Sequence, residues 1–422
     1  MPLAINLNIY QTLAAAIIVY YVGVFLRMKI PFLRQYCIPA PVVGGILFAI
    51  INTILYVNGL WKYEQDTIMQ NICMMIFFTS VGYTASLSLI KKGGVLVLKM
   101  AIITSVLIVC QNIIGITLTK IFDVPALMGL ATGSIPMVGG HATAAAFGPV
   151  LEKIGLENGT TISVAAATFG LVAGGLIGGP VGERLVHKNR LRSHAETERL
   201  DPETYQSEVD KLESVAGDVE KADALIKKDL KIGQTIDNYR FMNAMAHIFL
   251  AMGLGTILSS FFDSVGLVFP AYIGSMLVAA IIRNIADFTH VYKVYQRESE
   301  VLGNLGLTVF LTCVLMSLKL WQLSDLAIPM IAMLLSQAVF IAFFAYFIVY
   351  RIMGKNYEAA VMTSGTCGFG LGATPNAIAN MTAMTELFGP APTAFFVIPL
   401  IGSLIIDPVN ASILTIFLNL LK

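Results

Sequence analysis

Glycines and small polar residues gather near the end of the chain, where residues 365–381 read GTCGFGLGATPNAIANM. Glycine tolerates positive φ and leaves the backbone uncovered, so its peptide N–H and C=O groups can approach a small ligand. Hydroxyl and amide side chains beside such a backbone add direct contacts. The substrate-binding residues predicted in this stretch are Thr366, Gly368, Gly370, Gly372, Thr374 and Asn376.

A second stretch has the same character: residues 133–147 read GSIPMVGGHATAAAF. Within it, GGHAT at 139–143 aligns with GLGAT at 370–374, so that Gly139 pairs with Gly370 and Thr143 with Thr374. A histidine here suits a hydrogen bond to the substrate, and it equally suits a structural role in an apolar setting. The substrate contacts predicted here are Ser134, Gly139, Gly140, His141 and Thr143.

One acidic residue, Asp407, stands inside a long apolar run that reads IGSLIIDPVNASI at 401–413. A carboxylate at membrane depth is costly unless it is paired or binds a cation. The nearby apolar runs contain no obvious basic partner, which favours sodium, although a salt bridge or a helix cap is the alternative. The predicted sodium ligands are Asp407, Asn410 and the carbonyl groups of Gly368 and Gly370.

The elements that hold these residues are membrane-spanning helices. Of the 422 residues, 56% are hydrophobic and 13% are charged, with a mean hydropathy of +0.77. Apolar runs of about 20 residues, the length that crosses a bilayer, predict ten spans near 9–25, 38–57, 68–90, 94–119, 160–183, 240–262, 265–286, 300–318, 326–350 and 391–420. The fold class is therefore an all-α polytopic membrane protein.

Two further apolar stretches, 124–150 and 356–388, are interrupted by glycine, proline and polar residues. We predict re-entrant or broken helices there. Irregular backbone is tolerated at membrane depth only where protein or a water-filled cavity satisfies its polar groups. The two stretches should therefore line a site.

The chain divides into two halves around a charged linker. We predict an N-terminal membrane repeat at 1–185, a cytoplasmic linker at 186–239 and an inverted C-terminal repeat at 240–422. Five spans in each half would give the halves opposite orientations, and broken segments at matching places are typical of secondary transporters. The positive-inside rule predicts that loops rich in Lys and Arg are cytoplasmic. Both termini should then lie outside. The basic residues in these loops are Arg27, Lys29, Arg34, Lys91, Lys92, Arg283, Lys293 and Arg297.

Other functional classes fit less well. The glycine run lacks the Rossmann and P-loop patterns, and the spans contain neither HExxH nor paired aspartates for an intramembrane protease, so we do not expect an enzyme. TCGFG at 366–370 has the look of a potassium-channel filter. A channel, however, needs such loops around one axis from one face, and these two unequal loops enter from opposite faces.

Four segments carry a family resemblance: GSIPMVGGHATAAAF, ATFGLVAGGLIGGPV, GFGLGATPNAIANM and MGKNYEAAV. They resemble the bacterial sodium/glutamate symporters of the glutamate:sodium symporter (ESS) family over nearly the whole chain outside the linker. The resemblance implies ten spans in inverted halves, two re-entrant loops, sodium-coupled import of L-glutamate, and a homodimer in the bacterial inner membrane that works by an elevator-like movement. It implies no nucleic-acid partner.

The chain departs from the family pattern at two places. The usual SGGHGTGAAW is VGGHATAAAF here, and the usual GHCGFG is GTCGFG, with Thr366 in place of histidine. Both changes fall at predicted substrate positions. They leave open whether the substrate is glutamate, a related acidic amino acid or another small carboxylate.

Overall fold

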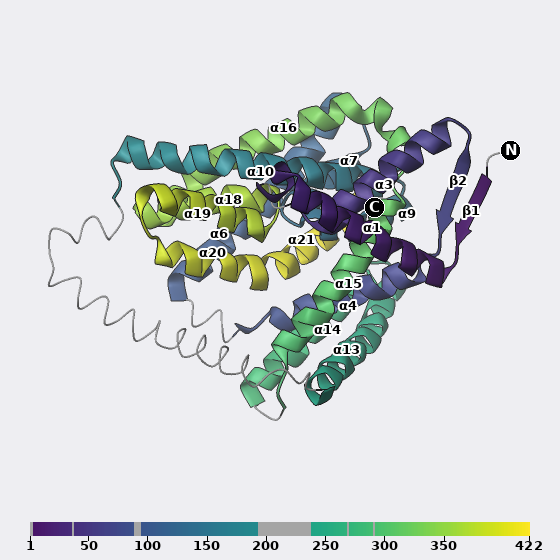
Figure 1. Ribbon diagram of the computed structural model, residues 1–422. Coiled ribbons are helices and arrows are strands. Elements are labelled where there is room, and N and C mark those ends of the chain that lie inside the picture. The colour runs from purple at the N-terminus through teal and green to yellow at the C-terminus, as the bar shows by residue number, and fades with distance from the viewer. Residues whose placement is uncertain (1–2, 36–37, 88–93, 193–237, 268–269, 290–291) are drawn as a thin grey trace.

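A computed structural model describes the chain except for residues 1–2, 36–37, 88–93, 193–237, 268–269 and 290–291. Most of the predicted linker therefore lies outside the described residues. Nearly all of the described chain is helical (Figure 1). Strand β1 (Leu3–Leu7), which precedes the first helix, pairs in parallel with β2 (Trp61–Gln65) in the one described sheet.

The N-terminal half contains four long helices, several shorter ones and a broken segment. The helices are α1 (Ile9–Lys29), α2 (Pro31–Gln35), α3 (Ala40–Val57), α4 (Ile68–Thr84), α6 (Gly94–Phe122), α7 (Ala126–Ala131), α8 (Ser134–Met137), α9 (Gly140–Lys153) and α10 (Gly159–Asn189). The stretch predicted at 124–150 is therefore broken into α7, α8 and α9. Each break contains a glycine, Gly133 before α8 and Gly139 before α9.

The C-terminal half follows the same order. Its elements are α13 (Asn238–Ser264), α14 (Ala271–Thr289), α15 (Gln296–Met316), η2 (Leu320–Leu326), α16 (Ala327–Phe344), η3 (Ala345–Val349), α17 (Tyr350–Ile352), α18 (Tyr357–Leu371), α19 (Thr374–Phe388), α20 (Pro392–Leu404) and α21 (Ile406–Leu421). The stretch predicted at 356–388 consists of α18 and α19.

The membrane-spanning character of the chain follows from helix length and hydropathy. Eight described helices are long and apolar enough to cross a bilayer, and α20 with α21 would make a ninth. Helix α4, with 17 residues, lies at the lower end of the length that a bilayer requires. The chain is therefore an all-α polytopic membrane protein, and the count of ten spans stays a prediction.

The last predicted span is not one straight helix. Helices α20 and α21 meet at a bend of 44°. Pro408 explains the break, because a proline ring clashes with the carbonyl group four residues earlier and offers no N–H. That earlier residue is Leu404, where α20 ends. Asp407 consequently lies in the first turn of α21, whereas the sequence indicated the middle of a span.

The helices pack into two groups. The first helix group comprises α1, α3, α4, α13, α14 and α15, in which α15 and α14 pack along α4 and α1 packs along α3. The second helix group comprises α6 to α10 and α16 to α21, in which α18 packs between α10 and α19. Figure 1 shows α4, α13, α14 and α15 side by side, apart from α10, α18, α19 and α20. Each group takes helices from both halves of the chain.

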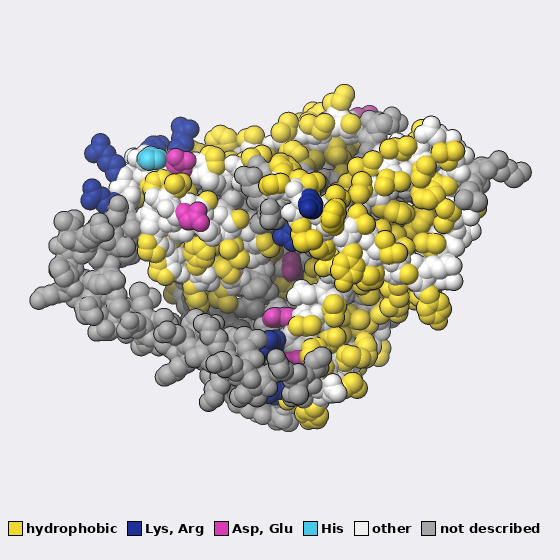
Figure 2. Space-filling model, in the orientation of Figure 1, with side chains coloured by type: hydrophobic (Ala, Val, Ile, Leu, Met, Phe, Trp, Pro, Cys, Tyr) yellow, Lys and Arg dark blue, Asp and Glu magenta, His cyan; other side chains and the backbone are white. Residues whose placement is uncertain are grey.

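Hydrophobic side chains spread over much of the described surface in Figure 2, most densely on the right of the view. Large apolar residues such as Ile18, Leu98 and Phe249 are exposed. Soluble proteins rarely expose continuous apolar patches of this extent. Lipid chains are the environment in which such a surface is stable.

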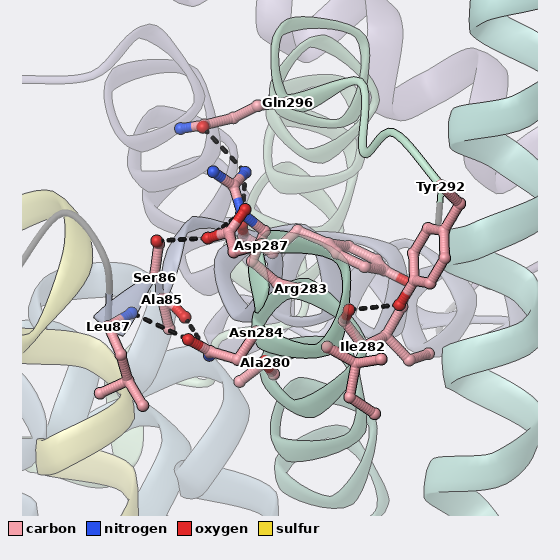
Figure 3. Close-up of polar contacts among 12 residues, drawn as sticks. Ala85, Ser86, Leu87, Ala280, Ile282, Arg283, Asn284, Asp287, Tyr292 and Gln296 are labelled. Atoms are coloured by element: carbon pink, nitrogen blue, oxygen red, sulfur yellow. Dashed lines mark hydrogen bonds and ion pairs between the residues drawn. The ribbon is translucent and has the colours of Figure 1, made fainter. Parts of the chain in front are cut away.

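A polar network joins the end of α4 to α14 and α15 within the first helix group (Figure 3). Arg283 Nε donates to both carboxylate oxygens of Asp287, at 3.0 and 3.1 Å. Ser86 Oγ donates to Asp287 Oδ2 at 2.5 Å, and an Arg283 amino group donates to Gln296 Oε1 at 3.1 Å. The ion pair is largely shielded from solvent, so the network joins α4, α14 and α15 through their polar ends.

Asn284 holds the residues that follow α4. Its Nδ2 donates to the carbonyl of Ala85 at 2.8 Å, and its Oδ1 accepts from the N–H of Leu87 at 2.9 Å (Figure 3). The chain crosses from α4 to α6, and so from the first helix group to the second, just beyond these residues. The connection between the groups therefore starts from a fixed point.

Candidate functional site

The two broken segments touch at Gly140 and Gly372. Gly140 begins α9 with a φ of +60°, and a Cβ added there would lie 2.8 Å from the carbonyl oxygen of Gly372. Gly372 directly follows α18. A residue with a side chain would be strained in this conformation and would also press on the carbonyl group. Gly140 and Gly372 are 232 positions apart in the sequence. The two aligned motifs therefore meet where the sequence indicated a site.

The other predicted glycines make close contacts with protein atoms. A Cβ on Gly139 would lie 2.4 Å from Thr143 Cβ, and one on Gly368 would lie 2.5 Å from the backbone nitrogen of Ala377. A Cβ on Gly370 would meet the flexible end of Ile341 at 2.7 Å. In this conformation these glycines let helices approach one another.

The hydroxyl groups predicted to bind substrate differ in access. Thr366 is fully buried, and its Oγ1 donates to the carbonyl of Met362 within α18 at 2.8 Å. Thr143 is buried beside Gly139. Thr374 begins α19 and is half-buried against Gly402 of α20. Of these three, Thr374 is the most accessible.

His141 and Asn376 both attach the broken segments to α10. The Nε2 atom of His141 lies 3.0 Å from Thr168 Oγ1, and Asn376 Nδ2 donates to the carbonyl of Leu171 at 2.6 Å. His141 is buried, with 6% of its surface exposed. Its Nε2 atom is thus engaged within the protein, and the predicted contact between His141 and the substrate stays a prediction.

Ser134 and Asn410 form a reciprocal pair. Ser134 Oγ donates to Asn410 Oδ1 at 2.8 Å, and Asn410 Nδ2 donates to the carbonyl of Ser134 at 3.2 Å. Asn112 Oδ1 on α6 accepts from the N–H of Ser134 at 3.0 Å. A predicted substrate residue and a predicted sodium ligand, 276 residues apart, are thus in direct contact.

Asp407 stands apart from the other predicted sodium ligands. Its side chain is half-buried, and the structure gives its carboxylate neither an ion pair nor a hydrogen bond within the described chain. No described contact joins it to Gly368 or Gly370. Its place in the first turn of α21 puts a negative charge at the positive end of that helix dipole.

Three buried amides were missed by the sequence reasoning. Gln111 and Asn112 lie in the middle of α6 and Gln337 lies in α16, and all three are fully buried. The available signal was the presence of amides within the apolar runs VCQNIIG and LLSQAVF. None of the three amides stands beside a glycine or proline that would interrupt the helix. The criterion of interrupted helices therefore does not identify these residues.

Glu358 is a buried acid that the sequence reasoning also missed, and its role is structural. Its two carboxylate oxygens accept from the N–H groups of Thr393 at 3.3 Å and Ala394 at 2.8 Å, at the start of α20. A carboxylate at a helix N-terminus satisfies donors that the helix cannot.

We expect Glu358→Ala to lower the free energy of unfolding by about 1.5–3 kcal/mol, the usual worth of hydrogen bonds to a charged group. Glu358→Gln keeps one acceptor and should lose less. Thermal melting in detergent measures both. Glu386→Ala on α19, where the side chain is exposed, is the control, and equal melting temperatures for Glu358→Ala and Glu386→Ala would contradict the capping role.

A cavity of about 1070 Å³ lies between the two helix groups. Its walls come from α4, α15 and η2 on one side and from the α9–α10 connection on the other. Polar and charged side chains line it, among them Gln70, Asn71, Glu152, Lys153 and Lys319. The boundary between the groups is therefore polar at this end.

Broken apolar segments that meet inside a helical membrane protein are characteristic of secondary transporters. The family model described as sodium/glutamate symporter matches residues 5–390, and the chain belongs to this family. The sodium/glutamate symporter of Escherichia coli (strain K12) is 38% identical over 416 residues, 98% of each chain. That of Haemophilus influenzae is 37% identical over 410 residues, 96% of each chain.

Among solved structures, a sodium proton antiporter from Methanocaldococcus jannaschii covers 98% of both chains with 16% identity and a TM-score of 0.44. The sequence relatives are symporters. The prediction of a membrane transporter rather than an enzyme is confirmed by this family membership.

Proposed function

We propose that this protein is a sodium-coupled symporter that imports L-glutamate or a related acidic amino acid. The observation that carries the proposal is the membership of the sodium/glutamate symporter family together with the contact between Gly140 and Gly372. That contact brings the two broken segments to one place. In transporters of this general design, substrate and ion bind between such segments.

Helix ends near that contact suit an anion. Helices α9 and α19 begin at Gly140 and Thr374, and a helix N-terminus carries a partial positive charge. The N-terminus of α19 has no side-chain cap, and Thr374 and Pro375 are not buried. We assign the substrate carboxylates to this region, with Thr374 as the hydroxyl contact.

Sodium is a hard cation and prefers oxygen ligands, so Asp407 is the residue to which we assign the coupling ion. The carboxylate has no partner among the described residues, as the site geometry shows. Asn410 is engaged with Ser134, and the carbonyl of Gly370 accepts from Gln111 Nε2 at 2.7 Å. The oxygens of Asn410 and Gly370 can coordinate sodium only in addition to these hydrogen bonds.

The two helix groups support an elevator-like mechanism. The second helix group contains both broken segments, Asp407 and α10, whereas the first contains none of the predicted site residues. The large polar cavity lies between the groups. We propose that the second group moves past the first and carries substrate and sodium with it, and that two copies associate as a homodimer.

Transport by the purified protein in proteoliposomes tests the function. We expect labelled L-glutamate to enter when an inward sodium gradient is applied and not when choline replaces sodium. A panel of unlabelled acidic amino acids and dicarboxylates identifies the substrate by competition. Exclusive competition by a dicarboxylate would favour another carboxylate as substrate, and sodium current without any substrate would favour a channel.

The proposed orientation places the linker in the cytoplasm and both termini outside. Lys422 Nζ donates to the carbonyl of Gly266 at 3.2 Å, which puts the C-terminus beside the end of α13. With β1 paired to β2, the N-terminus lies beside the α3–α4 connection, and both contacts agree with termini on one face.

We expect a cysteine introduced by Asp210→Cys in the linker to react with a membrane-impermeant maleimide only after the cells are opened. Lys422→Cys should react in sealed cells. Labelling of residue 210 in sealed cells would reverse the proposed orientation. The four native cysteines that the structure describes are buried or half-buried, so the unsubstituted protein serves as the background.

A further inference from the structure

Two buried glutamines, Gln111 of α6 and Gln337 of α16, each leave one amide oxygen unused. Both side chains have 0% of their surface exposed. Within the described chain, Gln111 Oε1 and Gln337 Oε1 have no hydrogen-bond partner. Native proteins leave few buried polar atoms in this state, and each such atom calls for an explanation.

Hydrogen bonds fix the orientation of both amides. Gln111 Nε2 donates to the carbonyl of Gly370 at 2.7 Å, and Gln337 Nε2 donates to the carbonyl of Gln111 at 2.8 Å. A carbonyl oxygen only accepts, so rotating either amide by 180° would place two oxygens together. The amide oxygens therefore face away from these carbonyls as free acceptors.

The two glutamines belong to one locality, at the second broken segment. Gln337 bonds to the backbone of Gln111, and Gln111 bonds to the carbonyl two residues before Gly372. A Cβ on Gly370 would lie near Ile341 and Leu107, which are four residues from Gln337 and Gln111 on the same two helices. The Gln111 amide thus lies beside the end of α18, and the Gln337 amide lies next to Gln111.

Two buried acceptors without donors are suited to a positive charge. Neutral amide and carbonyl oxygens are established ligands for hard cations, and they also accept hydrogen bonds from ammonium groups. We propose that Oε1 of Gln111 and Oε1 of Gln337 bind a positively charged group during transport, supplied by sodium or by the α-ammonium group of the amino-acid substrate. This inference rests on the proposed symport function and adds a position separate from Asp407.

Paired substitutions test the proposal at each glutamine. Gln111→Met and Gln337→Met keep the side-chain length and remove the oxygen. Gln111→Glu and Gln337→Glu keep an oxygen at the Oε1 position and replace the Nε2 donor with a carboxyl oxygen, which can donate to the same carbonyl only when it is protonated. Losing an oxygen that contacts a charged group should raise the half-saturating concentration of its ligand about tenfold or more, so we expect this in the Met variants, with the Glu variants closer to wild type.

Two ligand titrations distinguish the sources of the charge. Half-saturating sodium is measured for glutamate uptake and for thermal stabilisation in detergent, which also reports on variants that do not transport. Inhibition by glutarate, which lacks the ammonium group, is compared with inhibition by glutamate. A rise in half-saturating sodium assigns the oxygens to the ion, and weaker glutamate inhibition with unchanged glutarate inhibition assigns them to the ammonium group.

Thr104→Val is the matched control, because Thr104 is buried on α6 and bonds only within its helix, to the carbonyl of Met100 at 2.9 Å. Equal losses in the Met and Glu variants would overturn the proposal, since the Nε2 donors would then account for the effect. Unchanged titrations in the Met variants would overturn it as well. Absence of sodium-dependent uptake by the wild-type protein would instead reject the proposed function.

Discussion

Asp407→Asn is expected to raise the sodium concentration for half-maximal glutamate uptake by at least about tenfold. The substitution keeps the shape of the side chain and removes its charge. Contacts to a charged group are commonly worth about 1.5–3 kcal/mol, and every 1.4 kcal/mol corresponds to about a factor of ten in affinity. The carboxylate has no ion pair or hydrogen bond in the described structure, so the substitution breaks no internal contact.

Substrate affinity separates this role from a general defect. At saturating sodium, the Asp407→Asn protein should bind glutamate about as well as the wild type does. Asp123→Asn is the matched control: Asp123 follows α6 with a φ of +52°, a conformation that asparagine adopts as readily as aspartate. Unchanged sodium dependence in a well-expressed Asp407→Asn protein would remove this residue from the ion site.

Gly140→Ala is expected to reduce glutamate uptake by at least about tenfold, because positive φ alone costs an alanine about 1–2 kcal/mol. The added methyl group would also lie 2.8 Å from the carbonyl oxygen of Gly372, which is backbone and cannot turn aside like a side chain. The two broken segments must therefore move apart to make room for the methyl group. The substitution therefore acts at a place where the two broken segments meet.

A graded series of glycine substitutions checks this explanation. Gly179→Ala on α10 meets no atom within 4 Å and should transport normally. Gly370→Ala meets the flexible end of Ile341 and should lose less than Gly140→Ala. Size-exclusion profiles and melting temperatures establish whether each variant is folded. Normal uptake by a folded Gly140→Ala protein would show that this contact is not part of the transport site.

Local sequence features determined the fold class and the broken segments. Hydropathy over about 20 residues is a property of one helix in contact with lipid, and glycine or proline acts on the backbone where it stands. The breaks near Gly140 and Gly372 could be located for that reason. The family motifs in the same stretches then indicated the class of substrate.

Only the tertiary structure decided which residues meet. The pairing of Ser134 with Asn410 and the bond from Gln111 to Gly370 span 276 and 259 residues, and no local pattern encodes them. Gly368 and Gly139 suited ligand contact by residue type, yet protein atoms occupy the space beside them. Whether an exposed peptide group or amide faces a ligand, another helix or nothing depends on how the helices pack. The free oxygens of Gln111 and Gln337 became visible only once that packing was known, because their Nε2 donors are matched by carbonyls on other helices.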